Sequence, residues 1–176
     1  MTSGDTMLGL RRDRHFELHG RGAEPWVRRM ILMFLAAVVI AALAGAFGQQ
    51  HTTASAESSA ATLKVAAPQR VRGGLFFQGR IDIVARRAIV HPRLILGPGW
   101  TEQMQLNTIE PSPTGETSRA GRLQLAYDSL RAGDRLTIWV QFEANPTGVG
   151  HRDRSLTLLD GNRTLARVPG TMTTLP

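Results

Sequence analysis

One stretch of the sequence constrains the fold more than any other, because residues 30–47 run for eighteen positions without a charged side chain. As a helix, eighteen residues extend roughly 27 Å, close to the ~30 Å hydrocarbon core of a bilayer. A single span in lipid must satisfy its own backbone hydrogen bonds, so it has to be helical. Trp26 suits the membrane interface, and Arg28 and Arg29 can reach the lipid headgroups. We therefore expect a transmembrane helix at 30–47, with the lipid bilayer as its partner.

The charges on either side of this stretch predict its orientation. Residues 1–29 carry six arginines, whereas residues 48–63 carry neither Lys nor Arg. Positive charge is enriched in cytoplasmic flanks, which predicts a cytoplasmic N-terminus and an extracytoplasmic C-terminal part in the cell membrane. Residues 1–29 are too short to bury a core, so we expect a disordered basic segment there.

Other interpretations of the apolar stretch stay open. A cleaved signal peptide would need a small-residue cleavage site, which residues 44–46 or 54–56 could supply. The apolar run is longer than the usual 7–15 residues of a signal, which favours an uncleaved anchor. A buried helix of a soluble protein is rarely apolar on all faces over this length. Within the span, Ala37, Ala41 and Gly45 form a row of small residues that would allow a homodimer.

The remainder of the chain divides by composition. Residues 48–62 are rich in Ser, Ala and Thr, which predicts a flexible linker. From residue 63 to 176, short alternating runs are separated by Gly, Pro and Asp. With no cysteine in the chain, the fold of this part must rest on its apolar core alone.

The alternating runs predict β-strands. In residues 135–143, Leu136, Ile138, Val140 and Phe142 share one face, as a half-buried strand requires. The Asp160-Gly161 pair between two such runs predicts a hairpin. Further strands are expected at 75–77, 80–85, 94–96, 104–108, 121–127 and 171–175. The expected fold class is mainly β: an antiparallel, immunoglobulin-like sandwich of about seven to nine strands after a single transmembrane helix.

The run from Leu125 to Phe142, LAYDSLRAGDRLTIWVQF, carries a family resemblance. It resembles the late-strand segment of bacterial surface modules of the CARDB and conserved-repeat type, in which a Leu-x-x-Gly-Asp turn leads into a strand of alternating Thr and Val. The resemblance covers about residues 80–160 and implies an immunoglobulin-like sandwich on an N-terminal membrane anchor. Such modules are mostly adhesive, spacing or assembly domains, and no catalytic residues carry over.

Motifs that would indicate chemistry are missing from the sequence. It contains no nucleophile elbow, no His-Glu-x-x-His, no phosphate-binding glycine loop and no EF-hand loop. We therefore expect no enzyme, no catalytic residue, no cofactor and no metal site. The net charge of +7 comes from twenty arginines and one lysine scattered among acids, so we expect no nucleic-acid partner. Asp82, Glu143 and Asp153 are interpreted as solvated charges rather than as a calcium site.

Two places remain as candidate contact sites. Trp139 and Glu143 lie on the face opposite the apolar one; an exposed Trp139 would be a contact anchor, although we slightly favour a core position for it. The glycine-rich loop 145–154 offers Asn145, His151, Arg152 and Arg154 to a partner. The expected function is a non-catalytic interaction or assembly module that binds a protein or another component of the cell envelope. The alternatives are an extracytoplasmic ligand- or ion-binding sensor and an exported protein with a cleaved signal.

Overall fold

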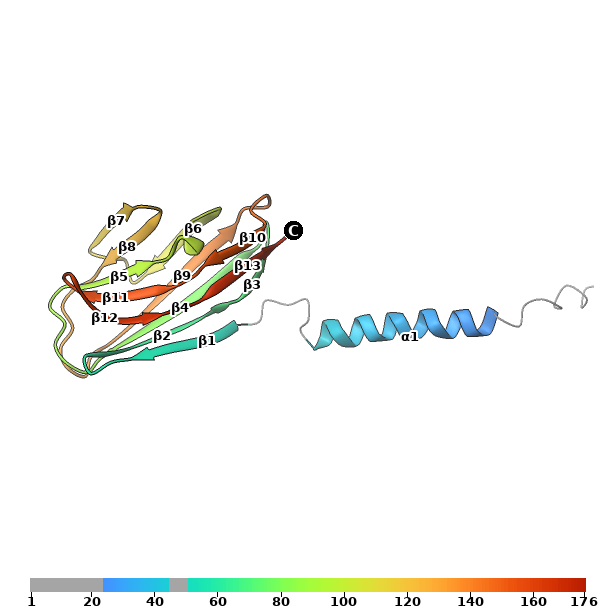
Figure 1. Cartoon of the computed structure of the whole chain (residues 1–176), viewed down its shortest axis with the longest axis horizontal. Helices are drawn as coiled ribbons and strands as arrows, with labels where there is room; N and C mark the ends of the chain where they lie inside the picture. The colour runs from blue at the N-terminus through green and yellow to red at the C-terminus, as the bar shows by residue number, and fades with distance from the viewer. Residues whose placement is uncertain (1–23, 45–50) are drawn as a thin grey trace, which may run out of the picture. The chain divides into compact units, whose positions relative to one another are not determined.

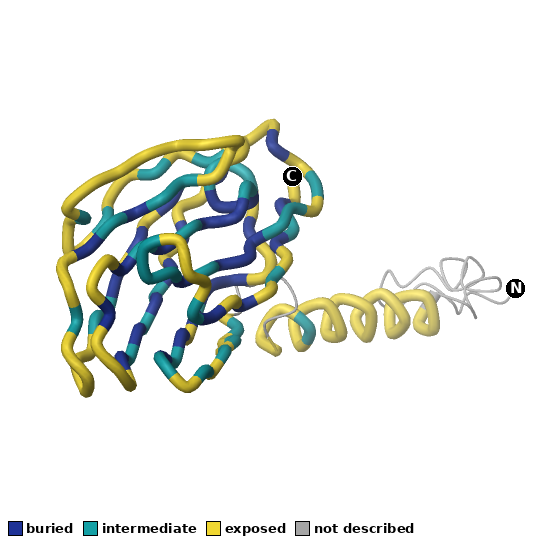
Figure 2. Tube along the Cα trace, turned by 60° about the vertical axis from the view of Figure 1, so that its left-hand side comes forward, coloured by how far each residue is buried: buried dark blue, intermediate teal, exposed yellow. Residues whose placement is uncertain are grey.

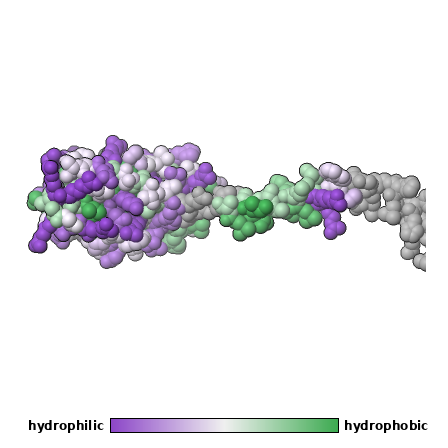
Figure 3. Space-filling view, turned by 90° about the horizontal axis from the view of Figure 1, so that it is seen from below, coloured by the Kyte–Doolittle hydropathy of each residue, from purple (hydrophilic) through white to green (hydrophobic). Residues whose placement is uncertain are grey.

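The computed structural model describes residues 24–44 and 51–176, which belong to two separate units. The first unit contains one helix, α1 (Glu24–Leu43), in which residues Pro25–Leu43 are long and apolar enough to cross a membrane. Figure 3 shows its surface as hydrophobic along most of its length. The length and composition of this helix fit a membrane anchor and a signal sequence equally. It begins six residues before the predicted start at Met30, and Gly45 lies outside the described residues.

The second unit is mainly β and forms a sandwich (Figure 1). One layer is the sheet β1-β2-β4-β9-β6, another is the sheet β12-β11-β5-β8-β7, and a short sheet β10-β13-β3 lies at one end. All ladders are antiparallel except the pair β3 and β13, which is parallel. The strands are β1 (His51–Glu57), β2 (Ala61–Pro68), β3 (Arg70–Arg72), β4 (Phe76–Ala85), β5 (Pro92–Leu96), β6 (Met104–Glu110), β7 (Gly115–Arg119), β8 (Arg122–Ala126), β9 (Arg135–Ala144), β10 (Gly150–Asp153), β11 (Leu156–Asp160), β12 (Arg163–Val168) and β13 (Thr171–Leu175), with a 3₁₀ turn η2 (Pro98–Trp100).

The mainly β fold, the antiparallel sandwich and the apolar N-terminal helix confirm the predicted fold class. The hairpin predicted at Asp160-Gly161 is present as β11 and β12. The described residues form more strands than the seven to nine expected, because β1, β2, β3, β7 and β10 cover segments for which no strand was predicted. Residues 154–155 separate β10 from β11, and residues 169–170 separate β12 from β13.

The predicted linker 48–62 needs correction, because most of it is folded. Strand β1 pairs with β2 along its whole length, from His51 opposite Pro68 to Glu57 opposite Thr62. Ala54 and Ala56 pack against the core, while the alternate side chains of β1 face outward. Small and polar residues suit an edge strand that covers little apolar surface, and the same composition is typical of a linker. Residues 48–50 lie outside the described residues, and the described part of the β unit begins at His51 rather than at Leu63.

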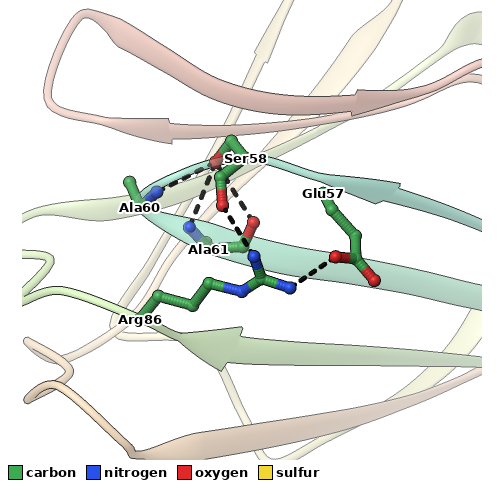
Figure 4. Close-up of polar contacts among 5 residues, drawn as sticks. All are labelled: Glu57, Ser58, Ala60, Ala61 and Arg86. Atoms are coloured by element: carbon green, nitrogen blue, oxygen red, sulfur yellow. Dashed lines mark hydrogen bonds and ion pairs between the residues drawn. The ribbon is translucent and has the colours of Figure 1, made fainter.

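A network of polar contacts closes the turn between β1 and β2 (Figure 4). The Ser58 hydroxyl oxygen accepts hydrogen bonds from the backbone N–H groups of Ala60 at 3.2 Å and Ala61 at 3.1 Å. Arg86, which follows β4, forms an ion pair with Glu57 and donates a hydrogen bond to the Ser58 carbonyl oxygen. The hairpin is thus fixed to the neighbouring strand by side chains as well as by its backbone ladder.

The core lies between the layers and is built from the inward-facing positions of the strands. Figure 2 shows buried and exposed residues alternating along most of them. Phe142 is central, with ring centroids 5.6 Å from both Phe77 and Trp100. Gly79 leaves the space that Trp100 occupies, because a Cβ at that position would lie 3.0 Å from the indole ring. Each fully buried side chain of this size contributes about 1.5–3 kcal/mol to stability.

We expect the replacement Ser58→Ala to lower the free energy of unfolding by about 1 kcal/mol, because two backbone N–H groups in the turn lose their acceptor. Urea unfolding followed by the fluorescence of buried Trp100 measures this change. The matched control is Ser55→Ala, an exposed position in the same hairpin, for which we expect a change within about 0.5 kcal/mol. Equal effects of the two variants would contradict the role of Ser58.

Candidate functional site

The outer face of the sheet β1-β2-β4-β9-β6 carries the main candidate site. The strand register brings side chains from three neighbouring strands together on this face: Arg80 of β4 lies opposite Trp139 of β9, and Lys64 of β2 lies opposite Asp82 of β4. We define the Trp139 face by the residues Lys64, Arg80, Asp82, Arg135, Thr137 and Trp139.

Trp139 is partly exposed, with 40% of its surface accessible, whereas its neighbours Ile138 and Val140 are fully buried. The slight preference for a core position was therefore wrong: the other layer of the sandwich packs against the opposite face of β9. The guanidinium carbon of Arg80 lies 5.2 Å from the centroid of the Trp139 ring, within the range of a cation–π interaction. Arg80 thus restricts the orientation of an aromatic ring that is open to solvent.

Asp82 holds Arg80 in place. Arg80 donates hydrogen bonds from Nε at 3.2 Å and from Nη2 at 3.0 Å to Asp82 Oδ1, which also accepts a hydrogen bond from Thr137 Oγ1 at 2.7 Å. Trp139, Arg80, Asp82 and Thr137 therefore form a continuous chain of contacts across β4 and β9. Thr137 and Trp139 are two residues apart on β9, so their side chains lie on the same face of the sheet. Arg80 and Asp82 on β4 therefore connect the Trp139 ring to Thr137, and the ring is held from both strands.

The pKa of the Asp82 carboxyl group lies below the ordinary value, although the group is partly buried. Burial alone would raise this pKa, because it penalises the ionised form. The hydrogen bond from Thr137 and the hydrogen bond and charge of Arg80 outweigh burial, with a further contribution from the charge of Arg135. Asp82 is therefore ionised at neutral pH and is already paired with Arg80.

An open hollow of about 410 Å³ lies beside this chain of contacts. Three of its lining residues are cationic and only one, Asp82, is anionic, so the hollow carries excess positive charge. The lining residues come from β1, β2, β4 and β9: Thr53, Thr62, Lys64, Ala66, Arg80, Asp82, Val84 and Arg135.

A second hollow of about 410 Å³ lies between the start of β6 and the end of β9. It brings together two of the predicted contact residues, Glu143 and Asn145, with Gln103 and Pro146 among the other lining residues. The Asn145 side chain is engaged in its own loop, because its Oδ1 accepts hydrogen bonds from the backbone N–H and the hydroxyl of Thr147. Asn145 therefore shapes the turn after β9.

The predicted contact loop 145–154 is only partly a loop, because Gly150–Asp153 form β10. His151 is exposed, and its Nδ1 lies 2.8 Å from Thr173 Oγ1. Arg152 is largely buried and donates a hydrogen bond from Nη1 to the Gly148 carbonyl oxygen at 2.8 Å. Arg152 therefore connects β10 to the preceding loop through this hydrogen bond.

The prediction that Arg154 contacts a partner also needs correction, because only 5% of the surface of this residue is exposed. Its Nη1 donates a hydrogen bond to the Pro68 carbonyl oxygen at 3.0 Å, and its guanidinium carbon lies 5.8 Å from the Trp100 ring centroid. Its backbone carbonyl oxygen accepts a hydrogen bond from Trp100 Nε1 at 3.1 Å. Burial lowers the pKa of the guanidinium group. Arg154 thus belongs to the interior of the sandwich and does not face a partner.

The other predicted positions lie apart from one another. Asp82 and Glu143 are on neighbouring strands but six register positions apart, and Asp153 lies in another sheet, where it accepts hydrogen bonds from Ser155. Across residues 24–44 and 51–176, no three His, Asp or Glu side chains gather closely enough to hold a metal ion. Trp26, Arg28 and Arg29 lie on α1 and are exposed.

The sequence did not predict that Lys64, Arg80 and Arg135 would meet. Each occupies an ordinary outward position in an alternating run, and the only signal is that spacing. Their meeting depends on the pairing of β2 with β4 and of β4 with β9, which joins segments far apart in the chain. No protein-family model matches the chain, and a search of curated proteins finds no significant match.

We expect stability to fall as pH drops below about 3.9, the ordinary pKa of Asp, towards the lowered pKa of Asp82. The reason is that a carboxyl whose pKa is lowered by folding stabilises the protein above its unfolded pKa. That contribution is lost as pH falls through the folded pKa. Thermal unfolding measured from about pH 2 to about pH 5 should show a smaller fall in stability for Asp82→Asn than for the unaltered protein.

The control for this experiment is Asp128→Asn, which removes an exposed carboxylate outside the Trp139 face. It should keep the pH dependence of the unaltered protein. If Asp82→Asn and the unaltered protein lose stability equally over the same pH range, the proposed network around Asp82 does not hold.

Proposed function

We propose that this chain is a single-pass membrane protein whose β-sandwich is a non-catalytic interaction or assembly module outside the cytoplasm. The Trp139 face is its contact surface. The observation that carries the proposal is the partly exposed Trp139 ring, held in place by Arg80 on an open sheet face. Exposed aromatic residues in fixed orientations are typical of binding surfaces, because less conformational freedom is lost on binding.

The proposed topology is supported by the helix and its flanks. The apolar residues of α1 are exposed in this unit, as lipid contact requires. Arg28 and Arg29 lie near the first residues of the helix, and residues 48–63 carry no Lys or Arg. This asymmetry favours a cytoplasmic N-terminus. A cleaved signal sequence would give the same extracytoplasmic domain without the anchor.

An immunoglobulin-like topology for the sandwich is part of the proposal. The constant-type immunoglobulin fold has strands A-B-E-D in one sheet and C-F-G in the other. Here the orders β2-β4-β9-β6 and β5-β11-β12 correspond to these two arrangements. The hairpin β7–β8 departs from the pattern, because it follows β6 in the chain but extends the sheet beside β5. The resemblance to CARDB-type surface modules is consistent with this topology.

Protease treatment of intact cells tests the topology. With an epitope tag at each end of the chain, we expect loss of the C-terminal tag and protection of the N-terminal tag, because the membrane shields the cytoplasmic side. Lysed cells serve as the control, in which both tags should become accessible. Protection of the C-terminal tag in intact cells would refute the orientation, and a product lacking the N-terminal tag before protease treatment would show signal cleavage.

A photo-crosslinking experiment in cells tests the contact surface. Benzoylphenylalanine at position 141, beside Trp139 on the same strand face, should form adducts with the partner. The control position is 167, an exposed arginine of β12 in the other layer. Trp139→Ala should reduce the adducts from position 141 severalfold, because the anchor residue is removed. Equal adduct yields from positions 141 and 167, or no adducts from either, would contradict the assignment of the Trp139 face.

A further inference from the structure

We infer that the ligand of the Trp139 face is an acidic polysaccharide, a chain of sugars bearing carboxylate groups. The inference rests on the proposed function, since it names the partner class of the same face. It combines three features of that face: unpaired positive charge, one partly exposed indole, and neighbouring amide and hydroxyl groups.

The charge of the hollow calls for an anionic ligand. Of its three cationic side chains, only Arg80 is paired with a carboxylate, and that carboxylate is Asp82. Among residues 24–44 and 51–176, no carboxylate lies within 4.0 Å of Lys64 or Arg135. These two residues are on β2 and β9, two strands apart, which places their backbones roughly 10 Å from each other. A ligand with charges repeated along its length can neutralise both.

The Trp139 ring favours a sugar over a simple anion. The C–H groups on one face of a sugar ring form an apolar surface that stacks on an indole, while the hydroxyl groups at its edge need hydrogen-bond partners. Gln78 and Gln141 lie opposite each other on β4 and β9, one outward position from Arg80 and Trp139. Thr108 of β6 adds a hydroxyl group 3.5 Å from the Gln141 amide oxygen. The Trp139 ring therefore lies near amide and hydroxyl groups that can form hydrogen bonds with the hydroxyl groups of a sugar.

The composition of the face disfavours other occupants. The core of a protein–protein interface is rich in apolar and aromatic contacts. On the outer face of β4 and β9, the exposed large apolar residues are Trp139 and Phe76, which are separated by the Gln78–Gln141 pair. Most of the other outward positions of these two strands are polar or charged. A lipid surface would use the cations and also suits a Trp side chain, but it would leave the Gln78–Gln141 pair beside the ring without a specific partner. An acidic peptide would likewise use the charges without needing a flat aromatic surface.

Isothermal titration of the full chain in neutral-detergent micelles tests the inference. The probes are polygalacturonate, poly-glutamate as a charge-matched chain without sugars, neutral dextran, and vesicles containing phosphatidylglycerol. We expect polygalacturonate to bind at least about tenfold more tightly than each of the other three probes. Raising the salt concentration should weaken this binding, because exposed charges are screened.

Four variants separate stacking from charge. Trp139→Ala should weaken polygalacturonate binding about tenfold, in the range of stacking on an aromatic side chain, and should leave any binding of poly-glutamate unchanged. Trp139→Phe should keep part of the affinity, which distinguishes lost stacking from a disturbed fold. The double variant Lys64→Gln/Arg135→Gln should weaken binding and reduce its salt dependence. Arg167→Gln, an exposed arginine in the other layer, is the charge control and should change neither.

The inference is overturned if poly-glutamate or the vesicles bind as tightly as polygalacturonate, if Trp139→Ala has the same effect as Arg167→Gln, or if polygalacturonate does not bind. These outcomes differ from failure of the proposed function. A Trp139-dependent crosslink at position 141 without polygalacturonate binding would keep the interaction module and reject the polysaccharide. Absence of that crosslink together with a protected C-terminal tag would reject the proposed function itself.

Discussion

The pairing of β4 with β9 is the interaction on which the other features of the domain depend. Nine residue pairs join these strands in one register, and each strand has one buried face and one face that is open to solvent. The inward side brings Phe77 beside Phe142 and leaves room at Gly79 for Trp100. The outward side brings Arg80 beside Trp139. A slip of one residue would exchange the two sets, placing charges in the core and aromatic rings in water. The stability of the core therefore also fixes the geometry of the Trp139 face.

A second constraint joins the sheets at one end of the sandwich. There, two long extended segments break at residues 154–155 and 169–170, and Arg154 fills the break. A buried guanidinium group is costly unless polar or aromatic partners surround it. Arg154 has the Pro68 carbonyl oxygen and the Trp100 ring, while the Trp100 N–H bonds to the backbone of Arg154 in return. The 3₁₀ turn η2 lies very close to the end of β10, because a Cβ at Gly99 would lie 2.6 Å from the Asp153 carbonyl oxygen. The glycine-rich loop after β9 therefore leads into a packed region.

These two constraints explain what the sequence could predict. Local patterns were sufficient for α1, for the alternation in β9 and for the turn at Asp160-Gly161, because each depends on neighbouring residues. Strand β1 was missed since Ala, Ser and Thr form a strand only when a partner such as β2 is present. The burial of Arg154 and the exposure of Trp139 were missed for the same kind of reason. Each depends on which distant segment packs against that residue, and alternation alone identifies the two faces of a strand without telling which one is covered.

The proposed membrane anchor also affects how tightly each copy of the domain must bind its ligand. The Trp139 face has one aromatic ring and two unpaired cations, which would give a modest affinity per copy. A membrane anchor changes this requirement, because copies held in one plane meet a polymeric ligand at high effective concentration. Each copy then needs only a weak contact, and a polymer with repeated charges can engage many copies together. An open and polar face suits this mode of binding better than a deep pocket. Such a pocket would raise the affinity of one copy but would admit only the end or a single unit of the chain.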